Sequence, residues 1–459
     1  MNSEVQTKEN KMGEMPVGKL LINMSLPIMI SMLVQALYNI VDSIFVARLS
    51  EDALTAVSLA FPIQTLMIAV GAGTGVGVNS LLSKSLGEKR QERADKTAMN
   101  GIFLYGVSYL VFLVIGFTCV APFYRGQVDA ATQSDIFTMG VSYLTIVCTC
   151  SFGLFTQFIT ERLLQATGRT IYTMITQGIG AITNIILDPI LIFGLLGAPK
   201  LGVAGAAIAT VIGQCVGGVL GIYYNKKVNT DIHFDFKKLR PDGEIIAKIY
   251  KVGVPAIIMQ AIGSVMTYGM NLILMGFSST AAAVFGIYFK LQSFFFMPVF
   301  GLNNGMIPII AYNYGAQKRK RVIKTIRYGA TVAAMMMVVG LILFNFFPQW
   351  LLGLFDASEA MLAIGVDALH IISIHFCAAW ASIIFGATFQ ALGNGLYSLI
   401  VSLVRQLVVL LPVAYLLAKI GGLSCVWWAF PIAEIAACTL SVIFFMRMYK
   451  GIIMKIPEE

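Results

Sequence analysis

Apolar runs of about twenty residues recur along the whole chain, and short polar segments separate them. A helical run of this length crosses about 30 Å of hydrocarbon at 1.5 Å per residue, and in a helix every backbone polar group bonds internally. The pattern therefore predicts an all-α, polytopic membrane protein. Its twelve expected transmembrane helices lie at residues 20–47, 53–83, 97–122, 136–160, 171–195, 203–225, 247–276, 281–312, 326–347, 361–388, 396–418 and 424–447.

The composition excludes a soluble protein. Hydrophobic residues make up 58% of the chain and charged residues 12%, whereas a soluble domain carries about 25% charge. So few charges would leave the surface of a soluble protein of this size largely apolar. A bilayer is therefore the expected surroundings of most of the chain.

The basic residues are unevenly distributed between the expected loops. With both termini in the cytoplasm, 26 of the 32 Lys and Arg residues fall in cytoplasmic segments. Such an excess is typical of cytoplasmic loops, and it also accounts for the net charge of +9. We therefore expect a multi-pass protein of the bacterial inner membrane whose partners include the lipid bilayer and no nucleic acid.

The two halves of the sequence repeat each other. A shift of 228 residues places Pro27 on Pro255 and Gln64 on Gln292. Further pairs at this shift are Phe61 and Phe289, Gly77 and Gly305, Gly87 and Gly315, Arg93 and Arg321, Lys96 and Lys324, and Thr97 and Thr325. A shift of 225 residues then matches 165–168 with 390–393. Ordered matches at a nearly constant offset indicate an internal duplication.

The duplication predicts two pseudo-symmetric six-helix bundles. Each half contains an even number of helices, so both halves enter the membrane from the same side and form parallel repeats. We expect an N-lobe at 1–227, a cytoplasmic linker at 228–246 and a C-lobe at 247–459. Two lobes that rock about a central site are the usual apparatus of alternating access, which favours a transporter.

Acidic residues inside the expected helices are the main candidates for a site, because a carboxylate at membrane depth costs at least about 2.5–3.5 kcal/mol. Asp42 has Asn39 one turn before it, and Asp188 has Asn184 one turn before it. Pro189 has no backbone N–H to donate, so we expect the helix to open there and free a carbonyl oxygen. These groups form a hard-ligand set suited to Na⁺ or to a proton.

Glu161 is a further embedded acid, although Arg162 and Arg169 lie nearby and an interfacial charge pair is the alternative. At the offsets of the repeat, Asp42 corresponds to Met270 and Asp188 to Val413, so neither acid has a polar counterpart in the second half. We therefore expect the cation site in the first lobe alone.

The second half contains its own embedded charges, Lys290, Arg405 and Glu434. Arg405 and Glu434 are expected to form a structural ion pair, and Lys290 to act as a contact between lobes or a gate. Asp367 and His370 lie one turn apart, where satisfied packing and a proton relay are both open interpretations.

Several short stretches resemble the motifs of one transporter family. They are Pro27 with the segment from Asn39 to Arg48, then Gln165 to Arg169, Asn184 to Pro189, and Gly202 to Thr210. Their order and spacing resemble the multidrug and toxic compound extrusion (MATE) family over essentially the whole chain. Because the acids lie in helices 1 and 5, the sequence is most similar to the bacterial branch named for DNA-damage-inducible protein F.

This resemblance implies a secondary active transporter that exports organic, often cationic, compounds in exchange for Na⁺ or H⁺. By matching position, Asp42, Asn184 and Asp188 would bind the coupling cation, with Thr210 as a fourth member. Asp42, Glu161 and Asp188 are the expected contacts for the small organic substrate. We expect a monomer that needs no cofactor besides the coupling ion and no metal other than Na⁺.

Two other classes of function are considered. A flippase for a lipid-linked precursor or oligosaccharide, from the same superfamily, would be expected to line its cavity with several cations, and here Lys290 and Arg405 are the embedded ones. An enzyme would need clustered nucleophiles, metal ligands or a phosphate-binding loop. The three histidines, at 233, 370 and 375, are not spaced as a metal site, so we predict that the protein is not an enzyme.

Overall fold

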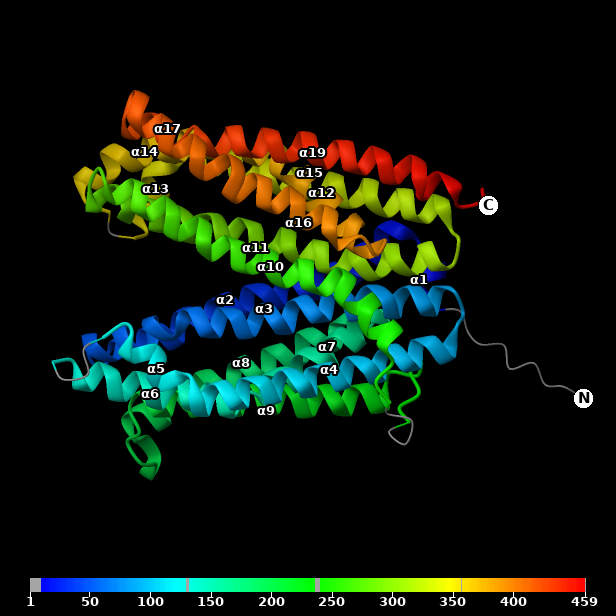
Figure 1. Ribbon diagram of the computed structural model, residues 1–459, viewed down its shortest axis with the longest axis horizontal. Helices are drawn as coiled ribbons and strands as arrows, with labels where there is room; N and C mark the ends of the chain where they lie inside the picture. The colour runs from blue at the N-terminus through cyan, green and yellow to red at the C-terminus, as the bar shows by residue number, and fades with distance from the viewer. Residues whose placement is uncertain (1–9, 129–131, 236–239, 356, 459) are drawn as a thin grey trace, which may run out of the picture. The chain divides into compact units, whose positions relative to one another are not determined.

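The computed structural model describes residues 10–128, 132–235, 240–355 and 357–458, and these described residues contain helices and no strand. Ten helices are long and apolar enough to cross a membrane, and two bent helix pairs bring the possible number of spans to twelve (Figure 1). The predicted all-α, polytopic membrane architecture is confirmed, with ten to twelve candidate spans among the described residues.

The helices cover each of the expected ranges. They are α1 (Lys11–Glu14), α2 (Val17–Ala47), α3 (Glu51–Gly87), α4 (Gln91–Thr118), α5 (Val120–Arg125), α6 (Ser134–Thr149), α7 (Phe152–Ala166), α8 (Thr170–Phe193), η1 (Leu195–Gly197), α9 (Val203–Lys227), α10 (Gly243–Met275), α11 (Ser279–Gly315), α12 (Arg319–Phe346), α13 (Pro348–Gly353), α14 (Glu359–Ser373), α15 (Phe376–Ala391), α16 (Gly395–Leu403), η3 (Val404–Leu410), α17 (Leu411–Gly421), α18 (Leu423–Val426), α19 (Ala429–Gly451) and η4 (Ile453–Lys455).

Two spans bend in the middle, which the uninterrupted apolar runs at 136–160 and 361–388 did not predict. The angle is 43° between α6 and α7 and 51° between α14 and α15. The breaks lie at Cys150 and His375, which correspond under the 225-residue shift of the repeat. The bend is therefore a duplicated feature, and in the first half it orients α7, the helix that carries Glu161.

The chain divides into two compact units. The unit that we call the N-terminal unit comprises Ile30–Leu82 and Gln91–Ile249. The C-terminal unit comprises Met1–Met29, Ser83–Arg90 and Tyr250–Glu459.

These units differ in detail from the expected lobes. The first turns of α2 belong to the C-terminal unit, although the expected N-lobe included them. The boundary within α2 comes two residues after Pro27, where a backbone hydrogen bond of the helix is missing. The expected linker lies next to the boundary at Ile249, and its residues 236–239, with Lys237 and Lys238, lie outside the described residues.

In the N-terminal unit, α8 and α9 cross at glycines that let their backbones approach closely. A Cβ atom on Gly180 would lie 2.9 Å from the Gly213 carbonyl oxygen, and one on Gly213 would lie 2.7 Å from the Gly180 carbonyl oxygen. Small residues at such crossings are typical of membrane helices, where close van der Waals contact drives association. The crossing brings Asn184 on α8 beside Thr210 on α9.

In the C-terminal unit, α11, α12, α15 and α19 pack side by side (Figure 1). Phe376 lies at the centre of their aromatic core, with ring centroids 5.2 Å from Phe344 and 5.4 Å from Phe296. The short helix α1 is tied to this unit because Arg321 donates hydrogen bonds to the carbonyl oxygens of Met12 and Met15, at 2.9 and 2.7 Å.

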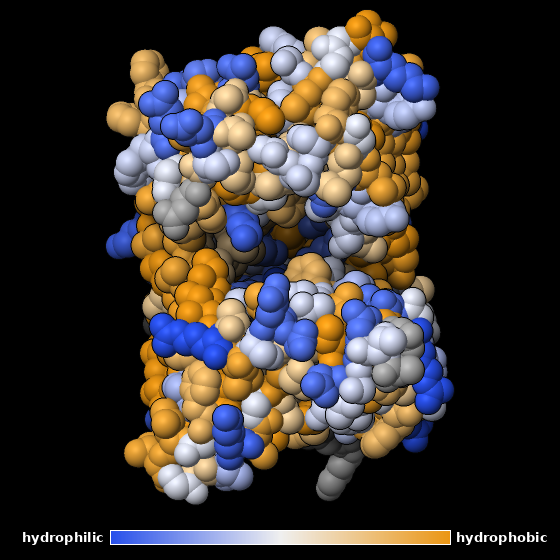
Figure 2. All heavy atoms as spheres, turned by 90° about the vertical axis from the view of Figure 1, so that its left-hand side faces the viewer, coloured by the Kyte–Doolittle hydropathy of each residue, from blue (hydrophilic) through white to orange (hydrophobic). Residues whose placement is uncertain are grey.

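The lateral surfaces of both units are apolar. Figure 2 views one end of the helices, and hydrophobic side chains cover the flanks while hydrophilic ones are scattered over the end that faces the viewer. Exposed apolar residues such as Phe117 (74% exposed) and Val219 (65%) lie on these helices. In water such surfaces would be unfavourable, so the arrangement suits a bilayer.

The glycine crossing gives a test of the fold. We expect Gly213→Val to destabilise the purified protein by about 1–3 kcal/mol, because the new side chain would overlap the backbone of α8. The matched control is Gly178→Val, since a Cβ atom at Gly178 has nothing within 4 Å. Thermal unfolding in detergent measures the difference, and equal midpoints for the two variants would contradict this account of the crossing.

Candidate functional site

Asp188 lies in the interior of the N-terminal unit together with the amide one turn before it. Its exposed fraction is 0% and that of Asn184 is 2%. Asn184 donates a hydrogen bond from Nδ2 to Asp188 at 3.3 Å. The predicted pairing of these two residues on one face of the helix is therefore present, and no Lys or Arg among the described residues forms an ion pair with Asp188.

Asp42 on α2 faces Asp188 on α8. The two carboxyl groups are close enough to interact directly. Asp42 Oδ1 is also buried and has no hydrogen-bond partner within the described part of the chain. Two carboxylates in contact repel each other strongly in a low-dielectric interior, so a proton or a small cation between them is favourable.

Thr210 completes this group from α9. When the Asn184 amide is oriented with its oxygen toward α9, the oxygen accepts hydrogen bonds from Thr210 N at 3.1 Å and from Thr210 Oγ1 at 3.3 Å. In the same orientation the Asn184 amide nitrogen donates to Asp188 Oδ2 at 3.2 Å. The four predicted residues thus meet at one place, and their donor atoms are the oxygens that Na⁺ prefers.

The helix around Pro189 differs from the expectation. α8 continues through this residue to Phe193 and does not open. Pro189 still lacks a backbone N–H, but the surrounding helix and the close contact with α9 keep the turn regular. The extra carbonyl ligand expected at this position is therefore not exposed by a break in the helix.

Glu161 on α7 is a second buried acid, with an exposed fraction of 3%. It accepts hydrogen bonds from Gln157 Nε2 at 2.9 Å, Gln177 Nε2 at 2.9 Å and Thr176 Oγ1 at 3.3 Å. Neutral donors satisfy this carboxylate.

The two arginines near Glu161 contact other residues. Arg162 donates from Nη1 to Gln165 Oε1 at 2.9 Å, and Arg169 pairs with Asp231. Among the described residues Glu161 has no ion pair, so the interfacial charge pair considered from the sequence is not formed. A buried acid held by neutral groups can exchange a proton or bind a cation without first breaking a salt bridge.

A cavity of about 70 Å³ connects the two groups of residues. Asn184, Thr210 and Tyr38 line it, and so does Glu161. The full lining consists of Gln35, Tyr38, Leu154, Gln157, Phe158, Glu161, Gln177, Gly180, Ala181, Asn184, Thr210, Gly213 and Gln214. The cavity therefore has Glu161 in its wall, together with Asn184 and Thr210, which contact each other beside Asp188.

Sequence reasoning missed several polar residues of this cavity. Tyr38 precedes Asp42 by one helical turn, and Gln157 precedes Glu161 by the same spacing. A search for polar residues one turn from each embedded acid would have found both. Gln177 carries no such signal, because it reaches Glu161 from a different helix.

The other polar residues singled out from the sequence, Asn39, Lys290, Arg405 and Glu434, do not gather at the Asp42–Asp188 site. Asn39 is exposed on α2, so it does not join the carboxyl groups. Lys290 is exposed, and its Nζ lies 6.0 Å from the centre of the Phe355 ring within the C-terminal unit. Arg405 Nη1 lies 3.6 Å from Glu434 Oε2, so the expected ion pair is formed there.

His370, considered from the sequence as packed or as part of a proton relay, contacts the backbone of a neighbouring helix. His370 Nε2 lies 3.1 Å from the carbonyl oxygen of Asn345, and Asp367 is exposed. These contacts favour the packing interpretation of His370. The described residues contain no group of three or more His, Cys, Asp or Glu side chains arranged to hold a metal ion.

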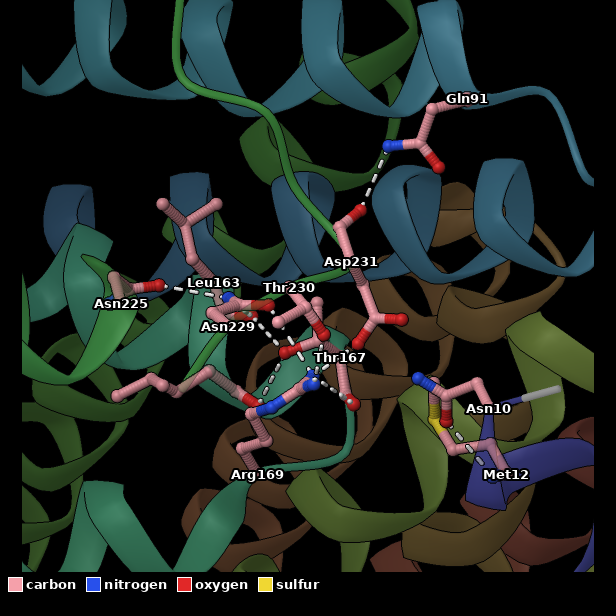
Figure 3. Close-up of polar contacts among 11 residues, drawn as sticks. Asn10, Met12, Gln91, Leu163, Thr167, Arg169, Asn225, Asn229, Thr230 and Asp231 are labelled. Atoms are coloured by element: carbon pink, nitrogen blue, oxygen red, sulfur yellow. Dashed lines mark hydrogen bonds and ion pairs between the residues drawn. The ribbon is translucent and has the colours of Figure 1, made fainter. Parts of the chain in front are cut away.

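Arg169 organises a polar network beside the expected linker (Figure 3). Its guanidinium forms an ion pair with Asp231 and donates to Asn229 Oδ1 at 3.4 Å and to Thr230 Oγ1 at 3.1 Å. Gln91 Nε2 donates to the Asp231 carbonyl oxygen at 2.9 Å. The start of the linker is thereby fixed to the N-terminal unit.

The comparison with known families gives one match that covers most of the chain. The sequence model of the MatE family matches residues 27–190 and 255–416, which are the two halves of the repeat. The multidrug export protein MepA of Staphylococcus aureus (strain MRSA252) is 28% identical over 440 residues, which cover 95% of this chain and 94% of that protein. MepA of Staphylococcus haemolyticus is 29% identical over 435 residues, covering 94% and 93%.

Solved structures show the same fold. One, described as the outward-facing conformation of a multidrug resistance MATE family transporter of the MOP superfamily, has a TM-score of 0.90 at 24% identity, covering 97% of this chain and 99% of that one. A MOP superfamily transporter from Pyrococcus furiosus, described as having a binding pocket of reverse polarity, has a TM-score of 0.87 at 26% identity, covering 98% and 99%.

The Arg169 network gives a test within this unit. We expect Arg169→Ala to increase hydrogen–deuterium exchange of residues 228–235 by about tenfold or more, because charge-assisted hydrogen bonds contribute about 1.5–3 kcal/mol each. Arg125→Ala, at an exposed arginine of α5, is the control. Exchange in 228–235 that stays at the wild-type rate in Arg169→Ala would show that other contacts hold this segment.

Proposed function

The chain belongs to the MATE family of membrane transporters, and we propose that it exports organic compounds in exchange for H⁺ or Na⁺. One observation carries this proposal: Asp42 and Asp188 face each other in the N-terminal unit, without an ion-pair partner among the described residues. Maintaining two such acids inside a membrane protein costs several kcal/mol. Binding of a small cation during each transport cycle would explain why two such acids are present despite this unfavourable free energy.

The proposed coupling step uses the contacts of α2, α8 and α9. A proton or Na⁺ entering between the two carboxyl groups removes their repulsion, and it draws Asp42 on α2 toward Asp188. α2 also contains Pro27, where its hydrogen-bond ladder is interrupted, so it can respond by bending. Binding drives transport only if the cation prefers one conformation over the other, since a ligand with equal affinity for both shifts nothing.

The proposed cargo is a lipophilic organic cation that contacts Asp42, Glu161 and Asp188. Glu161 lines the cavity of the N-terminal unit together with the aromatic residues Tyr38 and Phe158. Aromatic faces and a carboxylate together attract an organic cation through cation–π and Coulomb interactions. Cargo and coupling ion would then compete for the same negative charge, which links release of one to binding of the other.

A broad range of substrates is consistent with the relatives. Both MepA proteins bear the name multidrug export protein, and they align with this chain over nearly its whole length. We propose multidrug efflux on this basis, in a monomer of the inner membrane with both termini in the cytoplasm. A lipid-linked precursor or oligosaccharide flippase is the alternative, and Glu161 in the lining of the cavity, with no basic residue among the described residues there, favours cationic cargo.

Transport across liposome membranes tests the coupling site. We expect Asp42→Asn and Asp188→Asn each to lower gradient-driven uptake of a fluorescent lipophilic cation by at least about tenfold, equivalent to 1.4 kcal/mol. Each amide keeps the shape of the side chain but removes the negative charge that the coupling ion needs. Separately imposed Na⁺ and pH gradients identify the ion.

The matched control is Asn39→Ala, on the exposed face of the same helix as Asp42. This variant should transport like the wild type. Uptake that survives both aspartate substitutions would overturn the proposed coupling site, and uptake that no gradient drives would overturn antiport itself.

In this proposal Glu161 binds the cargo, and its role can be tested separately from ion coupling at Asp42 and Asp188. We expect Glu161→Gln to weaken binding of a lipophilic cation by about fivefold or more, because it removes a buried charge next to the cavity. Binding of an uncharged substrate of similar size should change less than twofold. Equal losses for charged and uncharged compounds, measured by fluorescence titration of the purified protein, would assign Glu161 to structure instead of cargo recognition.

A further inference from the structure

An open cavity of about 720 Å³ lies between the first turns of α2 and those of α12 in the C-terminal unit. Lys19 lines it from α2, and Lys320, Arg321 and Lys324 line it from α12. The other lining residues are Pro16, Val17, Gly18, Leu21, Ile22, Tyr328, Thr331 and Val332. Every charge among these described residues is positive, so the cavity is suited to an anion.

Two of these cations remain available for a ligand. Lys19 and Lys324 are exposed, and within the described residues neither forms an ion pair. Arg321 instead forms part of the fixed wall, because it donates to Asn313 Oδ1 at 2.9 Å and to the carbonyl oxygens of Met12 and Met15. The cavity thus combines a hydrogen-bonded arginine in its wall with two exposed ammonium groups.

An apolar groove of about 750 Å³ adjoins this cavity along α12, and Thr331 lines both. Its lining consists of Arg327, Ala330, Thr331, Ala334, Met335, Val338, Val339 and, from α15, Trp380. Met335 is 56% exposed and Val339 is 53% exposed. A basic cavity therefore adjoins a groove whose lining is mainly apolar, with Arg327 and Thr331 as its polar members.

We propose that the cavity and the groove together bind one anionic glycerophospholipid. Its phosphate lies between Lys19 and Lys324, and one acyl chain follows α12 past Thr331 toward Trp380. Basic pockets between membrane helices recognise anionic headgroups through such charge pairs, at about 1 kcal/mol per Lys or Arg. The chain-sized groove selects a lipid over a soluble phosphate, and a zwitterionic lipid gains less because its own cation meets the lysines.

The general excess of basic residues in cytoplasmic loops does not account for this arrangement. That excess explains why α12 begins with several cations. The excess does not require the cations of α12 to line one cavity together with Lys19 of α2. It also does not explain why the described lining of this cavity contains no acid and adjoins an apolar groove. The lipid would join the first turns of α2 to α12 within the C-terminal unit.

Native mass spectrometry of the delipidated, full-length protein tests this proposal. We expect phosphatidylglycerol to bind at least tenfold more tightly than phosphatidylcholine with the same acyl chains. The double variant Lys19→Gln/Lys324→Gln should weaken phosphatidylglycerol binding by roughly thirtyfold, from the loss of two lysine contacts. Phosphatidylcholine binding should change little.

The charge-matched control is Lys226→Gln/Lys251→Gln, at exposed lysines outside the cavity. It should bind phosphatidylglycerol like the wild type. Ala334→Phe fills the groove without changing charge, so it should weaken binding of long-chain but not short-chain phosphatidylglycerol. Equal binding by the wild type and the double lysine variant would overturn the proposal. Displacement by glycerol 3-phosphate at the same concentration as the lipid would also overturn it, in favour of a soluble phosphate.

Discussion

Burying carboxyl groups in a membrane interior without basic partners costs several kcal/mol. In the N-terminal unit, polar neighbours offset part of this free energy. Asp42 and Asp188 face each other, while Asn184 and Thr210 supply the nearby dipoles. Glu161 is likewise held by neutral donors. The acids are therefore held by polar groups without a basic partner among the described residues, and the proposed coupling cation would offset their charge.

The two halves of the duplicated fold differ at these acids in the residues that the structure describes. Both halves have a bent span at the equivalent position, so the helical scaffold was repeated. The position equivalent to Asp42 is Met270, which is fully buried in an apolar core. In the C-terminal unit the buried acid Glu434 lies beside Arg405 instead, as a paired charge. Among the described residues, the N-terminal unit thus holds buried acids without a basic partner, and the C-terminal unit holds an acid paired with Arg405.

Much of the fold could be predicted from the sequence, because apolar runs of membrane length determine where helices form. The Asn184–Asp188 contact followed from helical spacing, since residues four apart share a face. Spacing failed for Asn39, which lies about 60° around the helix from Asp42 and is exposed, because the edge of the buried face depends on how the helices pack. Gln177 and the bends depend on how helices pack against each other, which no local pattern specifies.

The central claim is that the facing carboxyl groups exchange a small cation. Infrared difference spectroscopy of the purified protein tests it most directly, by following the carboxylic acid band as pH or Na⁺ concentration is stepped. The account predicts a band that changes with one of these ions in the wild type and is lost in Asp188→Asn. A spectrum that neither ion alters, or a band that persists in that variant, would contradict it.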